Sequence, residues 1–280
     1  MMRGLDCVSS KSFKITPTES TEVFAIDISM AGSRRDLESQ STNVAAKGHS
    51  LWWHVVIDIP LIAIVIAVVG LYEFGIIPSH KSGFFCNDPQ LSFKFEGETV
   101  SAVALGCTVL LLPIAVILIS ELLLLDSDYL VRSRTTEAVR RTGLLYRNYA
   151  YGFVINLLTV EFIKGISGTP RPIFFDLCAP DTAVNCTTGG YIPTFECTSS
   201  HSWWKQYDSY HSFPSGHTSM SIYCGLFIAW YLQRRAFSWS SRTVFLVPCL
   251  QVCCVGYAAL CSLSRINDHY HHWWDVLVGT

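Results

Sequence analysis

The sequence predicts an all-α fold, a polytopic bundle of transmembrane helices, and two observations carry this prediction. Half of the 280 residues are hydrophobic and only 15% are charged, whereas soluble domains carry about a quarter charged residues. Apolar runs also recur along the chain, and about 20 apolar residues cross a hydrocarbon core roughly 30 Å thick. Because backbone groups in lipid must bond to one another, each run should be a helix. Nothing in the sequence indicates a nucleic-acid surface.

Five apolar runs account for the expected spans. The third is the weakest of them, and any single run can also be read as a buried core helix. Five runs of this length in one short chain argue against that alternative. The expected spans are residues 55–75, 101–125, 144–163, 217–235 and 243–263.

Residues 1–50 differ in composition from the rest of the chain. They are polar and lack the early apolar core of a cleavable signal peptide. Because such a composition buries too little apolar surface to fold, we expect a disordered N-terminal tail. Residues 51–280 then form the transmembrane domain.

Arginine side chains indicate the orientation of the spans. The loop at 126–143 and the loop after the fourth span are rich in arginine, whereas residues 76–100 hold only two lysines. The positive-inside rule puts the two arginine-rich loops and the tail 1–50 in the cytosol. Residues 76–100, residues 164–216 and the segment after 263 then face the outside or the lumen. The arginines concerned are Arg132, Arg134, Arg140, Arg141, Arg234, Arg235 and Arg242.

Two further features fit an outward face for the long loops. Asn185-Cys186-Thr187 is an N-x-T glycosylation acceptor, and it falls in a loop that the arginines place outside. Four cysteines also fall in the outward loops, in a compartment that permits disulfides. They allow three pairings that sequence cannot separate; we favour Cys186 with Cys197, because both lie in one loop. The four are Cys86, Cys178, Cys186 and Cys197.

Three polar clusters lie at the outward ends of the third, fourth and fifth spans, and so meet at one membrane face. Each has a plain interpretation. Basic side chains at helix ends reach toward water, Pro-Ser-Gly caps a helix start, and a His and an Asp four residues apart form an ordinary one-turn pair. Together they indicate a phosphate site. The clusters are KGISGTPRP (164–172), PSGH (214–217) and SRINDHYHHWWD (264–275).

Phosphate chemistry needs these residue types. Guanidinium groups grip two phosphate oxygens at once, and a helix start adds N–H donors, which Gly216 lets approach closely. One histidine can attack phosphorus while a second protonates the leaving oxygen. Asp275, one turn beyond His271, can hold that imidazole in the attacking tautomer. One lysine and two arginines neutralise the phosphate, so no metal is required.

The patterns K-x6-R-P, P-S-G-H and S-R-x5-H-x3-D, in this order and at matching helix ends, resemble the three signature motifs of the type 2 phosphatidic acid phosphatase superfamily. Within it the chain is most similar to animal lipid phosphate phosphatases, also called phospholipid phosphatases. The stretch GFFCND at 83–88 and a sequon between the first two motifs also fit that subgroup. The resemblance covers about residues 50–280.

The resemblance implies a magnesium-independent membrane phosphatase, without a cofactor, that acts on phosphatidate, lysophosphatidate, sphingosine 1-phosphate or ceramide 1-phosphate. Its site would face the extracellular or lumenal side, with the plasma membrane as the expected location. His271 would form a phosphohistidine, Asp275 would orient it, and His217 would protonate the lipid alcohol and then help activate water. The expected partners are the phosphorylated lipid and the membrane, and a homo-oligomer stays open. The expected phosphate-binding residues are Lys164, Arg171, Ser215, Gly216 and Arg265.

The chain departs from the family pattern in two ways. The family has six spans, whereas VLVGT after Asp275 is too short to cross a bilayer. We therefore expect a truncated sixth span and a lipid phosphatase domain, 51–280, that is incomplete at its C-terminus. Gly165 and Ile173 stand where many relatives have an aromatic residue and a histidine, and we expect both to tune the substrate pocket.

Other functions stand beside the phosphatase prediction. A catalytically impaired relative that binds a lipid or a partner is the main alternative: the truncated span favours it, and the intact motif residues count against it. A phosphatase for a soluble sugar phosphate would favour more spans. A haloperoxidase with the same motifs does not fit the membrane spans.

Several aromatic and histidine residues near the motifs are expected to have supporting roles only. His269 and His272 lie off the helical face shared by the predicted nucleophile and its aspartate. His201 and His211 are loop residues with no expected direct part in catalysis. Four tryptophans fit an aromatic belt at the lipid headgroups. They are Trp203, Trp204, Trp273 and Trp274.

Substitution of Asn185 by Gln tests the predicted orientation. Because only an outward sequon is glycosylated, wild-type protein from eukaryotic cells should lose apparent mass on endoglycosidase treatment, and Asn185→Gln should run at the treated mass from the start. Gel mobility measures both. As a control, Ser133→Asn creates an acceptor on the predicted cytosolic side and should add no mass; glycan attachment there would contradict the orientation.

Overall fold

The structure is a computed structural model that describes residues 54–73, 75–125, 131–239 and 243–280. The chain divides into two units, Met1–Ile57 and Asp58–Thr280, and the description below concerns the second. The disordered tail predicted for residues 1–50 lies outside the described residues. A π-helical turn, η2 (His54–Asp58), precedes the first long helix.

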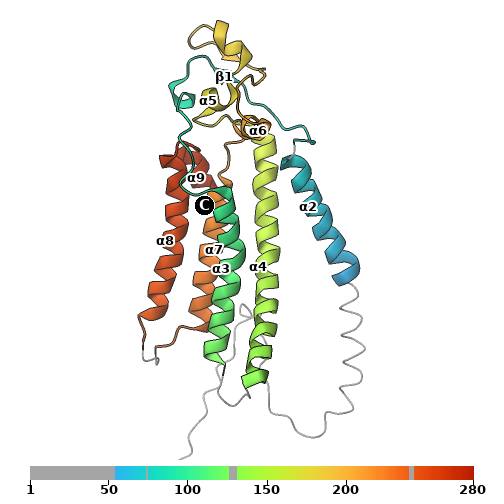
Figure 1. Ribbon diagram of the computed structural model, residues 1–280, viewed down its shortest axis with the longest axis vertical. Helices are drawn as coiled ribbons and strands as arrows, with labels where there is room; N and C mark the ends of the chain where they lie inside the picture. The colour runs from blue at the N-terminus through green and yellow to red at the C-terminus, as the bar shows by residue number, and fades with distance from the viewer. Residues whose placement is uncertain (1–53, 74, 126–130, 240–242) are drawn as a thin grey trace, which may run out of the picture. The chain divides into compact units, whose positions relative to one another are not determined.

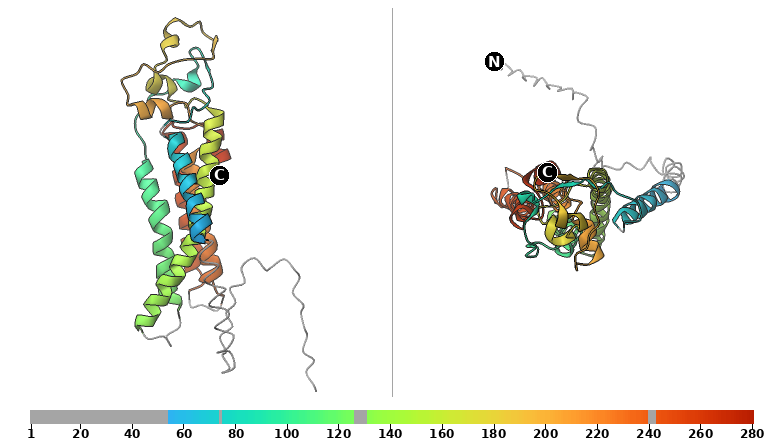
Figure 2. Two further views of the ribbon diagram at one scale, coloured as in Figure 1. Left: turned by 90° about the vertical axis from the view of Figure 1, so that its right-hand side faces the viewer. Right: turned by 90° about the horizontal axis from the view of Figure 1, so that it is seen from above.

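Five long helices make up most of the unit Asp58–Thr280, which confirms the all-α prediction (Figure 1). They are α2 (Ile59–Glu73), α3 (Ala102–Leu124), α4 (Val131–Ser167), α7 (Gly216–Arg235) and α8 (Leu246–Asn267). In both orientations α3, α4, α7 and α8 run side by side (Figure 2). Helix α7 packs against α8 and also touches α3 and α4, whereas α2 packs against α4.

Three helices of the described chain are long and apolar enough to cross a membrane. They are Ala102–Leu124, Ser133–Ser167 and Leu246–Asn267. A shorter apolar helix runs over Val56–Tyr72. Helix α7 is less apolar, because its first turn carries polar motif residues and its last turn carries two arginines. The fold is thus that of a multi-pass α-helical membrane protein.

Helix α4 is longer than the sequence predicts. Residues 126–143 were expected to form a loop, but the helix already begins at Val131. Glu137 pairs with Arg140 at 2.7 Å and with Arg141 at 2.8 Å, one turn away on the same face, which supports helix there. At about 1.5 Å per residue the 37 residues extend about 55 Å. These two arginines therefore lie on a helical extension beyond the span and not in a loop.

At the arginine-rich end of the bundle, the carboxylate of Glu121 on α3 joins three helices. It accepts hydrogen bonds from Arg235 Nε (2.8 Å) and from the Tyr231 hydroxyl (3.1 Å), both on α7, and lies 3.7 Å from Arg141 Nη1 of α4. Glu121 is only 1% exposed, and a buried charge needs compensation of this kind. The cluster therefore fixes the spacing of α3, α4 and α7 at this end.

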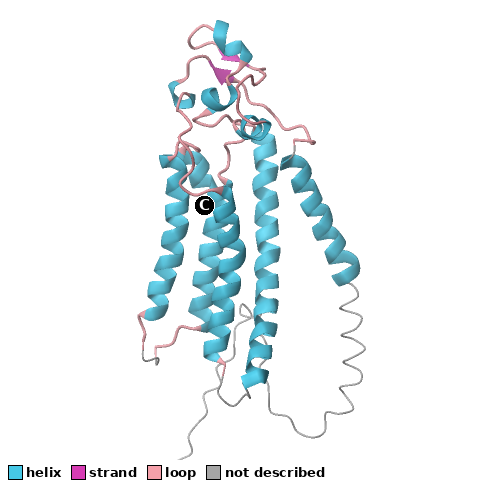
Figure 3. Cartoon of the chain, in the orientation of Figure 1, coloured by secondary structure: helices cyan, strands magenta, loops and turns pink. Residues whose placement is uncertain are grey.

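A cap built from residues 76–101 and 168–215 lies at the other end of the bundle (Figure 3). It contains a two-stranded antiparallel sheet in which β1 (Phe84–Phe85) pairs with β2 (Tyr191–Ile192). Four short helical turns complete it. They are η3 (Pro89–Leu91), α5 (Phe174–Cys178), η4 (Asp181–Asn185) and α6 (Trp203–Asp208).

The cap has an aromatic core of its own. The ring of Phe84 lies 5.4 Å from that of Phe174 and 5.6 Å from that of Phe195, and Phe195 lies 6.0 Å from Tyr210. All four side chains are buried. Tilted and edge-on contacts at these distances add to the stabilisation that burial provides. The cap can therefore hold a fixed shape outside the helical bundle.

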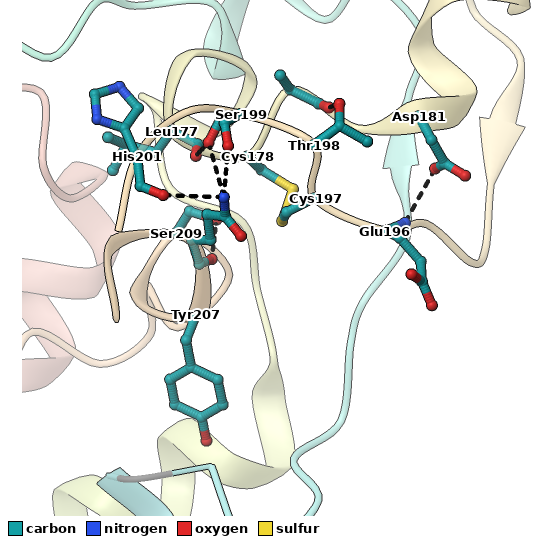
Figure 4. The surroundings of a disulfide bond; sticks show 12 residues. Leu177, Cys178, Asp181, Glu196, Cys197, Thr198, Ser199, His201, Tyr207 and Ser209 are labelled. Atoms are coloured by element: carbon teal, nitrogen blue, oxygen red, sulfur yellow. Dashed lines mark hydrogen bonds between the residues drawn. A yellow bond between two sulfur atoms is a disulfide. The ribbon is translucent and has the colours of Figure 1, made fainter. Parts of the chain in front are cut away.

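Two disulfides, Cys86–Cys186 and Cys178–Cys197, tie the cap together. The predicted preference for Cys186 with Cys197 is therefore wrong. The pairing of β1 with β2 brings the first two cysteines together, and a β-bridge between Pro180 and Cys197 aligns the second pair (Figure 4). Cys186 and Cys197 do not pair, although they share a loop, because that loop makes both contacts: one part pairs with β1 and the other with the segment at Pro180.

Helix α9 (Trp273–Gly279) follows α8 at the cap end and packs against α7 and α8. His272 caps it, with the side chain of Asp275 accepting from the backbone N–H of His272 in return. Four tryptophans at the cap end of the bundle are exposed, and their place in an aromatic belt stays a prediction. They are Trp203, Trp204, Trp273 and Trp274.

Peptide mapping without reduction tests the disulfide pattern. It should recover the two cross-links of the structure, and the pair Cys178→Ser with Cys197→Ser should lower stability by about 3 kcal/mol, because a closed loop of 19 residues is released. Thermal unfolding in detergent measures the loss. Cys249→Ser, at an exposed free cysteine, is the matched control and should change neither result. A peptide that joins Cys186 to Cys197 would contradict the structure.

Candidate active site

The first turn of α7 brings the second and third motifs together. The Oγ of Ser215 accepts hydrogen bonds from the backbone N–H of Thr218 (3.4 Å) and from its hydroxyl (3.0 Å), which caps the helix. The backbone N–H of Ser215 donates to the carbonyl of Asp275 (3.0 Å). Ser215 is fully buried. It therefore holds the start of α7 against α9.

Gly216 brings Lys164 of α4 to the same turn. A Cβ on Gly216 would lie 3.4 Å from Lys164 Nζ, so the ammonium approaches the backbone directly. Lys164 Nζ also pairs with Glu161 at 2.9 Å. The end of α4 is fixed to the segment before α7 by the backbone N–H of Ser212, which donates to the carbonyl of Thr169 (2.9 Å). The first and second motifs therefore share one contact region.

Arg171 lies at the buried centre of the site. Its Nε donates to the carbonyl of Asp208 (2.7 Å), its Nη1 to the carbonyl of Tyr270 (3.1 Å), and its Nη2 to the Asp208 carboxylate. Nη1 also lies 2.9 Å from Nε2 of His271. The guanidinium packs 4.4 Å from the centre of the Tyr270 ring. Through these contacts the first motif touches the third.

Asp208, the last residue of α6, is a site residue that the sequence analysis missed. Besides Arg171, its carboxylate accepts from the Tyr270 hydroxyl (3.1 Å). Burial alone would raise the pKa of Asp208, but the positive charge of Arg171, with Lys164 further off, holds that pKa below its ordinary value. The ionised carboxylate then fixes the guanidinium. No motif marks Asp208 in the sequence, because its partner lies 37 residues away.

The contacts of His271 define its tautomer. An arginine N–H can only donate, so Nε2 of His271 accepts from Arg171 and carries the lone pair. The ring proton then lies on Nδ1, which is 3.7 Å from Oδ2 of Asp275 and 3.5 Å from Oγ of Ser212. Burial, together with the charge of Arg171, lowers the pKa of His271 to about 4. The imidazole is therefore neutral at pH 7, with its lone pair on the side of Arg171.

The carboxylate of Asp275 is held by neighbours on both sides. Its Oδ2 accepts from the Ser212 hydroxyl and from the backbone N–H of His272 (2.9 Å), and Nδ1 of His272 lies 3.3 Å away. Asp275 is 1% exposed. Its other oxygen, Oδ1, has no hydrogen-bond partner within the described ranges. Ser212 and His272 thus position the carboxylate that faces His271.

Arg265 and His217 meet at Glu98, in the segment before α3. The fully buried Arg265 donates to Oε2 of Glu98 (3.1 Å) and to Oδ2 of Asp268 (2.9 Å). Nε2 of His217 lies 3.9 Å from the same Glu98 oxygen and has no hydrogen-bond partner in the part of the chain that the structure describes. The motif residues within electrostatic range of His217 are Arg265, His271, Arg171 and Lys164.

The structure thus gathers the predicted motif residues at the cap end of the bundle, in two groups. Direct contacts join Arg171, His271, Asp275 and Ser215, whereas the side chains of Arg265 and His217 meet at Glu98. The backbone N–H of His271 also donates to the carbonyl of Arg265 (3.2 Å), which links the two groups. Asn185, the predicted glycosylation site, ends the turn η4 in the cap. Sequence analysis missed the acidic and hydroxyl side chains that hold the motif residues in place. They are Glu98, Asp208, Ser212 and Asp268.

Comparison with known proteins places the chain in a family. Residues 145–280, which include all three motifs, match the model of the PAP2 superfamily. Phospholipid phosphatase 1 of Rattus norvegicus is 32% identical over 234 residues, covering 81% of this chain and 79% of the relative. The mouse form (Mus musculus) is 31% identical over 229 residues, covering 79% and 78%. Mouse phospholipid phosphatase 2 is 28% identical over 232 residues, covering 81% of each.

The chain therefore belongs to the phospholipid phosphatases of the PAP2 superfamily. No solved structure matches it.

An NMR titration of imidazole nitrogens tests the electrostatics of the site. The signal that is absent from His271→Gln should titrate near pH 4, well below an ordinary histidine at about 6.5, because burial and Arg171 disfavour the imidazolium. The lone pair is then available above pH 4 and is lost as the pH falls through that value. A midpoint for His271 at or above 6.5 would contradict this geometry.

Proposed function

We propose that the chain is an integral-membrane lipid phosphate phosphatase that hydrolyses phosphatidate, lysophosphatidate, sphingosine 1-phosphate or ceramide 1-phosphate through a phosphohistidine. The observation that carries the proposal is the contact between Arg171 Nη1 and His271 Nε2 at 2.9 Å. A phosphate that accepts from this guanidinium has its phosphorus beside the lone pair of the imidazole. The names of the relatives supply the class of substrate.

In the first step a phosphate oxygen takes over the hydrogen bond that Arg171 Nη1 gives to Nε2 of His271. The freed lone pair of Nε2 attacks phosphorus as the P–O bond to the lipid breaks. The leaving alkoxide takes a proton from the imidazolium form of His217, which the negative charge of the bound phosphate favours. The alcohol departs neutral and His217 is left as a neutral imidazole. Positive charge that develops on the His271 ring is stabilised by Asp275 on the Nδ1 side. Water then gives a proton to the neutral His217 and attacks phosphorus, and the P–N bond to His271 breaks. This releases phosphate and restores His217 as imidazolium and His271 as neutral imidazole.

Lys164, Arg171 and Arg265 stabilise the phosphate oxygens in this scheme, with Gly216 allowing close approach to the start of α7. Ser215 donates a hydrogen bond to the phosphate from its hydroxyl, because its backbone N–H already donates to the carbonyl of Asp275. Arg265 is paired with Glu98 and Asp268 in the structure. Phosphate oxygens therefore have to replace Glu98 on this arginine when the substrate binds. No metal takes part in either step.

The active site faces the extracellular or lumenal side in this proposal, and the plasma membrane is the expected location. The cap carries the sequon at Asn185 and both disulfides, which belong to an oxidising compartment. The arginines of α4 and α7 lie at the opposite end of the bundle, where the positive-inside rule expects the cytosol.

A catalytically impaired relative that binds a lipid or a partner protein is the second candidate. One observation favours it: every predicted phosphate-binding cation has an acidic partner in the structure. Lys164 pairs with Glu161, Arg171 with Asp208, and Arg265 with Glu98. If these pairs persist with lipid present, the phosphate is left without cations and no hydrolysis follows.

Phosphate release from phosphatidate micelles, with magnesium chelated, separates the two candidates. The wild type should release phosphate, and His271→Ala should lower the rate by at least about 10³-fold, because the nucleophile is removed. His269→Asn, at a nearby histidine with a left-handed backbone (φ 53°), is the matched control and should keep most of the activity. A wild-type rate of phosphate release no higher than that of His271→Ala would contradict the enzyme proposal and favour the binding role.

A further inference from the structure

A small pocket lies beside Lys164, where α2, α4 and α6 meet. Its lining includes Tyr72 of α2, Lys164 and Gly165 of α4, and Trp204 and Tyr207 of α6. Its volume is ≈ 20 Å³. A site needs roughly 10–15 Å³ to hold one water, so this pocket takes a single group of the size of a hydroxyl or an amine. The mechanism above makes no use of it.

Gly165 keeps this pocket open. A Cβ at that position would lie 2.5 Å from Cε1 of Tyr72, far inside van der Waals contact. Any larger side chain would therefore displace Tyr72 or fill the space next to Lys164. From the sequence we expect Gly165 to tune the substrate pocket, and in the structure it lies in the lining of this one.

His211 lies in the polar part of the lining, together with Glu161, Lys164 and Asp208. Its Nδ1 lies 2.8 Å from the carbonyl of Tyr207; because a carbonyl only accepts, Nδ1 carries the proton. Burial lowers the pKa of His211 to about 4, so the ring is neutral at pH 7 and Nε2 is a hydrogen-bond acceptor. His211 is 5% exposed, and its Nε2 has no partner among the residues that the structure describes. A buried acceptor of this kind is costly unless a donor reaches it.

The pocket adjoins the proposed phosphate site. Asp208, which holds Arg171, is also part of the lining, and the charges of Asp208, Lys164 and Arg171 all act on the His211 ring. Lys164 thus belongs both to the proposed phosphate site and to the lining of this pocket, which it shares with His211. The group that enters must be small, because of the volume, and must be a donor, because of the lone pair.

We propose that His211 accepts a hydrogen bond from a hydroxyl or ammonium group that the substrate carries on the carbon next to its phosphate-bearing carbon. The inference rests on the proposed phosphatase function and adds a substrate preference. Lysophosphatidate, with a free hydroxyl at that carbon, and sphingosine 1-phosphate, with an ammonium, satisfy Nε2. Phosphatidate has an acyl ester there, which offers no donor and does not fit the pocket, so it is the poorer substrate.

The test compares lysophosphatidate with its 2-deoxy analogue, which has the same acyl chain and lacks only the hydroxyl. The ratio of the two kcat/KM values, from phosphate release in micelles, should be about tenfold in the wild type, as expected for one buried acceptor left unpaired. His211→Phe keeps a ring but removes the acceptor, so the ratio should fall to near one. His211→Gln restores an acceptor and should recover part of it. His201→Phe, at a histidine outside this pocket, should leave the ratio as in the wild type.

A ratio is independent of how much of a variant folds, and the wild-type ratio needs no variant at all. A wild-type ratio near one, with both lipids hydrolysed, would overturn the role of His211 and leave the phosphatase function intact. Release from neither lipid above the His271→Ala level would overturn the phosphatase function and this inference with it. A ratio that stays near tenfold in His211→Phe would assign the discrimination to another residue.

Discussion

The rest of the site depends on the hydrogen bonds that the buried guanidinium of Arg171 makes. This guanidinium binds α6 through Asp208, the segment before α9 through the carbonyl of Tyr270, and the imidazole of His271 through Nη1. A fully buried arginine needs a charged partner, and Asp208 supplies it. Because arginine cannot accept, the same contact fixes the proton of His271 on Nδ1, toward Asp275. The Arg171–Asp208 ion pair thereby holds the guanidinium that sets the position and the tautomer of His271, the proposed nucleophile.

The cap and the bundle each hold part of this site in place. Helices α4, α7 and α8 bring the motif residues to one end, and the Glu121 cluster fixes the spacing of α3, α4 and α7 at the other. The cap, stiffened by two disulfides and an aromatic core, carries Asp208, Ser212 and His211 to the ends of these helices. Each motif cation meets a carboxylate there. Under the proposed function, phosphate oxygens would take the places of these acidic side chains when the substrate binds.

Much of this arrangement could be predicted from the sequence, because apolar length and short motifs are local signals. The helical spans, the gathering of the motifs at one end of the bundle and the pairing of His271 with Asp275 all follow from such patterns. The early start of α4 could not be predicted in this way. Its arginines suggested a cytosolic loop, but their ion pairs with Glu137 support a helix. The disulfide pairs and the partners Asp208 and Glu98 were also missed. They depend on how the cap folds back on the bundle. Arg171 and Asp208 are 37 residues apart in the sequence, and Arg265 and Glu98 are 167 residues apart.

The central claim is that Nε2 of His271 attacks phosphorus. The most direct measurement is to quench the enzyme during turnover of a ³²P-labelled lipid phosphate and to identify the labelled residue and ring nitrogen by mass spectrometry and ³¹P NMR. The account predicts an acid-labile phosphohistidine at residue 271 with phosphorus on Nε2, and no label in His271→Ala. Label on Nδ1, or on another residue such as His217, would contradict it.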